Sequence, residues 1–153
     1  MFNAQIIKAI LYTAGTSMVP VLEVKAAIPI GTAMGLTLWQ SFFVAVAASS
    51  LPAPLIILFV RPILRWLSRL AFLKPAVSWI ERHADKKGDQ VRKYSLLGLF
   101  ILVAIPLPGT GVWTGSLVAA VLDLRIKHAL PVIFLGNIVA SFCILLLTGL
   151  FVW

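Results

Sequence analysis

The sequence has little of what a soluble enzyme needs. Only 12% of its 153 residues are charged and 61% are hydrophobic, which leaves too little polar surface to cover a soluble globule. The single cysteine, Cys143, has neither a disulfide partner nor a second thiol for a metal site. The chain also lacks an HExxH motif, a phosphate-binding P-loop, a Ser/His/Asp set and a paired-carboxylate site. We therefore expect an integral membrane protein that is not an enzyme and binds no metal or cofactor.

Negative charge is scarce as well. Five Asp and Glu oppose 13 Lys and Arg, which gives a net charge of +8. Most of the cations lie in residues 61–93 between apolar segments rather than among base-reading aromatics, so we expect membrane lipids and not nucleic acid as partners. Arg61, Arg65 and Arg69 recur every four residues, on one face of a helix whose other face is apolar. We expect this helix to lie on the lipid surface.

Two similar motifs interrupt the apolar chain. Residues 26–35 are AAIPIGTAMG and residues 103–115 are VAIPLPGTGVWTG, each broken by proline and glycine and each followed by a long apolar segment. A bilayer tolerates non-helical backbone only where protein buries it or a polar cavity receives it. We interpret the motifs as corresponding parts of two repeats of one membrane unit, and we expect a functional site near them.

Hydropathy and segment length predict an all-α integral membrane protein with a single membrane domain. Two repeats, at about residues 3–60 and 95–153, would each contain a re-entrant hairpin and a spanning helix. An amphipathic cytoplasmic insert of about residues 61–94 would join them. The apolar segment 95–105 is too short to span, so we expect it to turn back at the second break.

The cations also predict the orientation in the membrane. The insert and the turn at Arg125 and Lys127 belong on the cytoplasmic side by the positive-inside rule. The spanning helices, expected at about residues 39–60 and 129–153, therefore run in opposite directions. Two similar halves of opposite direction form inverted repeats, whose re-entrant tips are expected to meet near the bilayer midplane.

Two segments carry a family resemblance. LEVKAAIPIGTAMGL at residues 22–36 and AIPLPGTGVWTGSLVAAVLDLRIKHAL at residues 104–130 resemble the small multidrug export protein family of bacteria and archaea. The acid ahead of a Pro/Gly break is more distantly similar to the DedA family and its eukaryotic relatives, the VTT-domain proteins. The resemblance implies a multi-pass protein of the bacterial or archaeal cell membrane. The nearer family implies drug export, and the distant relatives imply transport or scrambling of lipids, including polyprenyl phosphates.

The breaks also predict where a substrate binds. A half-helix that starts after Gly31 or Gly111 would present unpaired backbone N–H groups and partial positive charge, which suit an anion and particularly a phosphate. Lys25 would add a full charge. Alternatively, the glycines and threonines only allow close helix packing and satisfy the broken backbone. The predicted substrate-binding residues are Glu23, Lys25, Pro29, Gly31, Thr32, Pro106, Pro108, Gly109, Thr110, Gly111, Trp113 and Thr114.

Glu23 is the acid that this pattern places within the membrane. Ionisable groups there usually pair, relay protons or line a water-filled path. Glu23 is therefore a candidate for proton coupling. The alternative is a structural carboxylate at the interface, paired with Lys25 or with a helix N-terminus. Asn137, the one strongly polar residue inside the last spanning helix, is expected to bond across helices.

These observations favour a transporter that acts as a homodimer. It would move an amphiphilic or phosphate-bearing lipid across the bilayer between two facing re-entrant loops, with proton coupling through Glu23 left open. One alternative is an exporter of small lipophilic cationic drugs, which would rely on Glu23 and on aromatic faces such as Trp113. A further alternative is a non-transporting scaffold that binds anionic lipid through Arg61, Arg65 and Arg69.

Overall fold

The computed structural model describes residues 4–67 and 88–151, and within these residues every regular element is a helix. The helices are α1 (Ala4–Met18), α2 (Glu23–Ala33), α3 (Leu38–Ser50), α4 (Pro52–Leu67), α6 (Gly88–Ala104), α7 (Val112–Val121) and α8 (Ile126–Phe151). Residues 68–87, which make up most of the predicted insert, lie outside the described residues.

Two helical stretches in the described residues are long and apolar enough to cross a membrane. They are Leu38–Ile63, which comprises α3 and most of α4, and Ile126–Phe151, which is α8. Each has 26 residues. At 1.5 Å per residue this length is about 39 Å, more than the ~30 Å of a hydrocarbon core. The prediction of an all-α membrane protein is confirmed at this level.

Local sequence signals explain the bounds of the first spanning stretch. A capping box starts α3: Oγ1 of Thr37 accepts from the backbone N–H of Gln40 (3.2 Å), and Oε1 of Gln40 accepts from the N–H of Thr37 (3.0 Å). The helix is interrupted at Leu51, and α4 restarts with Pro52, because proline is favoured at a first helical position but lacks the N–H that a helix interior needs.

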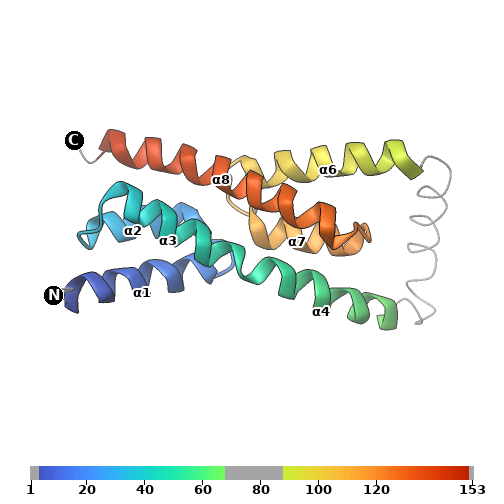
Figure 1. Ribbon diagram of the computed structural model, residues 1–153, viewed down its shortest axis with the longest axis horizontal. Coiled ribbons are helices and arrows are strands. Elements are labelled where there is room, and N and C mark those ends of the chain that lie inside the picture. Colours follow the sequence, from blue (N-terminus) through green and yellow to red (C-terminus); the bar gives the residue numbers. More distant parts are fainter. Residues whose placement is uncertain (1–3, 68–87, 152–153) are drawn as a thin grey trace.

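The helices form two groups at opposite ends of an elongated molecule. Figure 1 shows α1, α2 and α3 at the left and α4, α6 and α7 at the right, while α8 runs antiparallel to α3 and α4 along both groups. We call the antiparallel pair α1 and α2 the first hairpin, and the antiparallel pair α6 and α7 the second hairpin. Their connections, residues 19–22 and residues 105–111, are the first and second tips. Both tips lie in the middle of the molecule.

Each hairpin has its own hydrophobic core, and α8 contributes to both. The first core joins α2 and α3 to the C-terminal half of α8 through Ile28, Phe42 and Leu145. The second core joins α4, α6 and α7 to the N-terminal half of α8, and its fully buried members include Ile57 and Ile133. Large apolar side chains such as Phe59, Leu146 and Phe151 are exposed on the outside, as expected for a surface that faces lipid.

The two sequence motifs do not occupy equivalent positions, which corrects the expected repeat register. Most of the first motif lies within α2, where Pro29 and Gly31 are both helical, and the second contains the tip between α6 and α7. A single proline costs a helix one hydrogen bond and can be tolerated. Two prolines followed by Gly109 (φ +83°) and Gly111 (φ +134°) cannot be helical. The predicted break at residues 26–35 is therefore mostly helix.

Candidate functional site

The two hairpins contact each other through Glu23. This residue begins α2, is 2% exposed, and its Oε1 accepts a hydrogen bond of 2.9 Å from the backbone N–H of Trp113. Trp113 is the second residue of α7, so the donor is one of the N–H groups that a helix N-terminus leaves unpaired. The carboxylate of one hairpin thus caps a helix of the other, where the helix dipole favours negative charge.

Gly111 makes this approach possible. It is the N-cap residue of α7 and has φ +134°, a backbone conformation that side-chain-bearing residues rarely adopt. A Cβ atom at this position would overlap Oε2 of Glu23. A helix does start just after Gly111, as predicted, and the carboxyl group at its N-terminus is that of Glu23.

Lys25 neutralises the buried carboxylate and contacts the second tip. Its Nζ lies 3.6 Å from Oε2 of Glu23 and donates a hydrogen bond to the carbonyl of Thr110. The side chains of Lys25 and Glu23 are 15% and 3% exposed. An ion pair so well buried is retained only when further hydrogen bonds satisfy both partners, as they do here.

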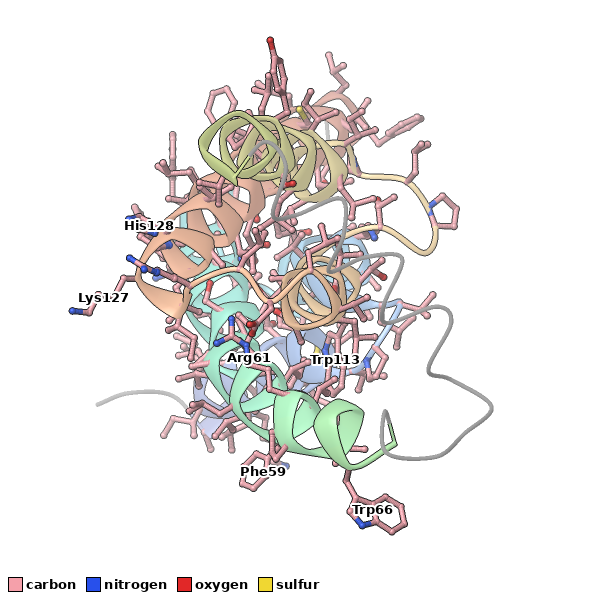
Figure 2. The ribbon with its side chains drawn as sticks, turned by 90° about the vertical axis from the view of Figure 1, so that its right-hand side faces the viewer. Phe59, Arg61, Trp66, Trp113, Lys127 and His128 are labelled. Atoms are coloured by element: carbon pink, nitrogen blue, oxygen red, sulfur yellow. The ribbon has the colours of Figure 1, made fainter. Side chains whose placement is uncertain are left out.

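Trp113 provides a contact in the opposite direction. Its indole Nε1 donates to the carbonyl of Met18 across 3.1 Å. Met18 is the last residue of α1, where backbone carbonyls lack helical partners. Each hairpin therefore supplies a side chain that caps a helix of the other. Viewed end-on in Figure 2, the half-buried Trp113 lies near the middle of the projected molecule, whereas Phe59, Trp66 and Lys127 point outward at its edge.

The first tip holds the acid in an unusual backbone conformation. Val21 and Glu23 have φ values of +75° and +42°, in the left-handed region that favours glycine. Such conformations are costly for residues with side chains and cluster at functional sites. The sequence pattern predicted a break after Glu23, at residues 26–35, whereas in the structure the chain turns before Glu23, at residues 19–22.

The threonine hydroxyls bond within their own segments. Thr110 Oγ1 donates to the carbonyl of Ile105 (2.6 Å), and Thr114 Oγ1 donates to the carbonyl of Gly109 (2.7 Å), so both stabilise the second tip. Thr32 Oγ1 bonds back to the carbonyls of its own helix. These contacts match the alternative in which the hydroxyls satisfy broken backbone.

Gly31 does not begin a helix, contrary to expectation. It lies buried inside α2, and a Cβ there would be 2.6 Å from Oγ1 of Thr13 and 2.7 Å from Oγ of Ser41. Its lack of a side chain lets α1, α2 and α3 approach closely, as small residues do in membrane helices. The N–H groups that were predicted at Gly31 are already paired within the helix because the helix starts eight residues earlier, at Glu23.

An open groove leads from the molecular end to Lys25. It has a volume of about 380 Å³ and runs between α2 and α8. Three predicted site residues, Lys25, Pro29 and Thr32, line it from α2, and the remaining lining is Ala33, Ile144, Leu147, Thr148 and Phe151. Among these residues Lys25 carries the only charge. The prolines of the second tip, Pro106 and Pro108, do not line it.

Arg61 does not lie on the lipid surface, which corrects its predicted role. It belongs to α4, donates to the backbone carbonyl of Leu124, and its Nε lies 3.6 Å from Oδ1 of Asp123. Its side chain is only 19% exposed. It was misassigned because cation spacing does not reveal a partner on a distant turn. The side chain of Arg65 and all of Arg69 lie outside the described residues.

Asn137 bonds across helices as expected. Its Nδ2 donates to Oγ of Ser49 (2.8 Å) and to Oγ of Ser50 (3.1 Å), at the interruption between α3 and α4. The residue is 2% exposed. This polar contact links the two spanning stretches at mid-length.

Fold and site together define a small helical protein of the membrane class, with two stretches long and apolar enough to span and two hairpins that contact each other. A family model described as "Putative small multi-drug export protein" matches residues 23–143. The match covers most of the chain, so the protein belongs to this family, whose description makes it a membrane export protein. The matched region begins at Glu23 and includes Lys25, Gly111 and Trp113. No curated protein and no solved structure matches the chain.

Proposed function

We propose that this protein exports an amphiphile with an anionic group, such as a phosphate-bearing lipid, by way of the contact between its two tips. The observation that carries the proposal is the position of Lys25. One end of a mostly apolar groove is formed by this single cation, whose Nζ also reaches Glu23 and the second tip. An apolar chain fits such a groove, and an anionic head group fits the cation at its end.

The dimensions of the hairpins support a re-entrant arrangement. With 11 and 10 residues, α2 and α7 are only about 16 and 15 Å long, half of what a bilayer requires. Because the hairpins approach the middle from opposite ends in Figure 1, we propose that they enter from opposite membrane faces as inverted repeats. This arrangement makes the protein multi-pass in a bacterial or archaeal cell membrane.

Transport would require the two tips to separate and re-form. The contact between Glu23 and α7 and the hydrogen bond from Lys25 to the carbonyl of Thr110 hold them closed, and the ion pair between Glu23 and Lys25 within the first hairpin supports both. Protonation of Glu23 would weaken both contacts, so a proton can be coupled to opening. A second copy of the chain, packed in the membrane as a homodimer, would cover part of the apolar surface of each hairpin.

Export of lipophilic cations is the competing function, and the family description together with Trp113 favours it. The charge distribution argues against it. Glu23, the acid at the tip contact, is already neutralised by Lys25 and by the N-terminus of α7. A cation that followed the groove to its inner end would be repelled by Lys25.

Reconstitution into liposomes tests the proposal. A labelled alkyl phosphate, a labelled neutral phospholipid and a lipophilic cation are followed in parallel for the wild type, Lys25→Met and Lys8→Met. Lys8 is exposed on α1, away from the groove, and is the matched control. Movement of the alkyl phosphate should fall about tenfold or more in Lys25→Met, because a hydrogen bond to a charged group contributes ~1.5–3 kcal/mol. Movement of the cation alone, unaffected by Lys25, would refute the proposal.

A further inference from the structure

The N-terminus of α7 is built to hold an anion, and the protein's own carboxylate occupies it. Trp113 supplies a backbone N–H, Gly111 leaves space, and Lys25 supplies a positive charge 3.6 Å from Oε2 of Glu23. Backbone N–H groups, a helix dipole and a cation are the recurring components of phosphate and carboxylate sites. Glu23, at 2% exposure, fills this position completely.

We infer that Glu23 is an internal competitor for the anionic group of the transported molecule. The inference rests on the proposed function and concerns the same site. The carboxylate of Glu23 and a phosphate or carboxylate of the substrate occupy the N-terminus of α7 in turn, and Lys25 contacts whichever is bound. Two anions cannot share this buried position, because like charges at such short range strongly disfavour each other.

The geometry allows the exchange. Lys25 lines the groove and also forms the ion pair with Glu23. A head group that follows the groove to Lys25 therefore arrives beside the Glu23 carboxylate that it must displace. Glu23 is held by a tip in which its own φ and that of Val21 are positive, a conformation that is costly for residues with side chains. The other components of the site are backbone N–H groups of α7, which belong to a different hairpin from Glu23.

Competition with an anionic substrate and direct recognition of a cationic substrate by Glu23 predict opposite effects on binding when Glu23 is removed. If Glu23 contacted a cationic substrate, its removal would weaken binding. If Glu23 competes with an anionic substrate, its removal vacates the site, and binding of the anion becomes tighter.

The experiment measures binding to the full chain in an uncharged detergent by calorimetry. The probes are dodecyl phosphate, inorganic phosphate and dodecyltrimethylammonium. The variants are Glu23→Ala, which empties the site, Glu23→Gln, which keeps size and an acceptor but no charge, and Asp123→Asn. Asp123 is an exposed acid distant from the tips and serves as the control. We expect dodecyl phosphate to bind Glu23→Ala about tenfold more tightly than the wild type, Glu23→Gln by an intermediate factor, and Asp123→Asn unchanged.

A second variant identifies the site itself. Adding Gly111→Ala to Glu23→Gln places a methyl group in the anion position, and the gain in affinity should disappear. Tighter binding of inorganic phosphate as well would identify the head group as sufficient, whereas a gain for dodecyl phosphate alone would show that the chain in the groove is also needed. Equal or weaker binding of dodecyl phosphate by both folded Glu23 variants overturns the inference.

The inference and the proposed function can fail separately. If the Glu23 variants bind dodecyl phosphate more tightly but liposomes containing the wild type do not transport it, competition stands and export of anions is wrong. If the wild type transports it and the variants show no gain in affinity, export stands and competition is wrong.

Discussion

The backbone N–H of Trp113 lies 2.9 Å from Oε1 of Glu23, although the two residues are 90 positions apart and belong to different hairpins. In return, the indole of Trp113 bonds the last carbonyl of α1. Two helix ends that would otherwise be unsatisfied in a low-dielectric environment are therefore closed by the opposite hairpin. The contact that joins the hairpins is thus also the contact that completes their helices.

Glu23→Gln should remove the pH dependence of transport. Glutamine keeps the size of the side chain and an acceptor for the N–H of Trp113, but it does not take up a proton in this range. We expect the rate of alkyl phosphate movement in liposomes to vary with pH in the wild type and to be flat in the variant. The matched control, Asp123→Asn, should behave as the wild type. A folded Glu23→Gln protein with the wild-type pH profile would exclude Glu23 as the coupling group.

Gly31→Ala should destabilise the first hairpin. The new methyl group would meet Thr13 Oγ1 at 2.6 Å and Ser41 Oγ at 2.7 Å, and overpacking of this kind costs ~1–3 kcal/mol. Thermal unfolding in detergent measures the loss. Gly98→Ala is the control, because nothing lies within 4 Å of its added Cβ, so its stability should be unchanged or slightly higher. Equal stability of the two variants would contradict the close packing of α1, α2 and α3.

Asn137→Ala should weaken the contact between the two spanning stretches. It removes the hydrogen bonds to Ser49 and Ser50, and interhelical bonds in membranes contribute ~0.6–2 kcal/mol each. Ser50→Ala removes one of these bonds and should cost less. The two variants are compared by thermal unfolding, and a larger loss in Ser50→Ala would count against Asn137 as the centre of this contact.

Arg61→Gln should lower stability without changing the response to lipid. The variant loses the hydrogen bond to the carbonyl of Leu124, which is worth ~1.5–3 kcal/mol for a charged donor. Lys127→Gln, at an exposed position, should have little effect. Thermal unfolding is measured with and without added anionic phospholipid. A loss of the lipid-dependent stabilisation in Arg61→Gln would restore the lipid-surface role that the structure argues against.

Labelling of single cysteines tests the orientation in the membrane. In a Cys143→Ser background, Lys127→Cys should react from the cytoplasmic side, since the positive-inside rule assigns Arg125 and Lys127 to that side. Lys8→Cys should react from the opposite side, because the N-terminal part of α1 lies at the far end of the molecule. Reaction of both cysteines from the same side would rule out hairpins that enter from opposite faces.

The sequence by itself determined the features that depend on local chemistry. The apolar composition predicted a membrane protein, because the hydropathy of a segment depends only on its own residues. Pro106, Pro108 and Gly109 specified the second tip, and α7 begins where predicted, just after Gly111, because the φ restrictions of proline and the freedom of glycine act on the residues themselves. A pairing of Glu23 with Lys25 or with a helix N-terminus was the alternative to proton coupling, and the structure contains both contacts.

Only the tertiary structure decided which residues meet. Pro29 stays helical because α2 is packed between α1, α3 and α8, a context that overrides the local signal that made its motif resemble the second tip. The partner of Glu23 is a backbone N–H, which every sequence offers at nearly every position, so no pattern could single out Trp113. Arg61 likewise bonds a backbone carbonyl on a turn 63 positions away. The packing of the hairpins against α8 fixes such pairings, because it decides which unsatisfied helix ends come within reach of a side chain.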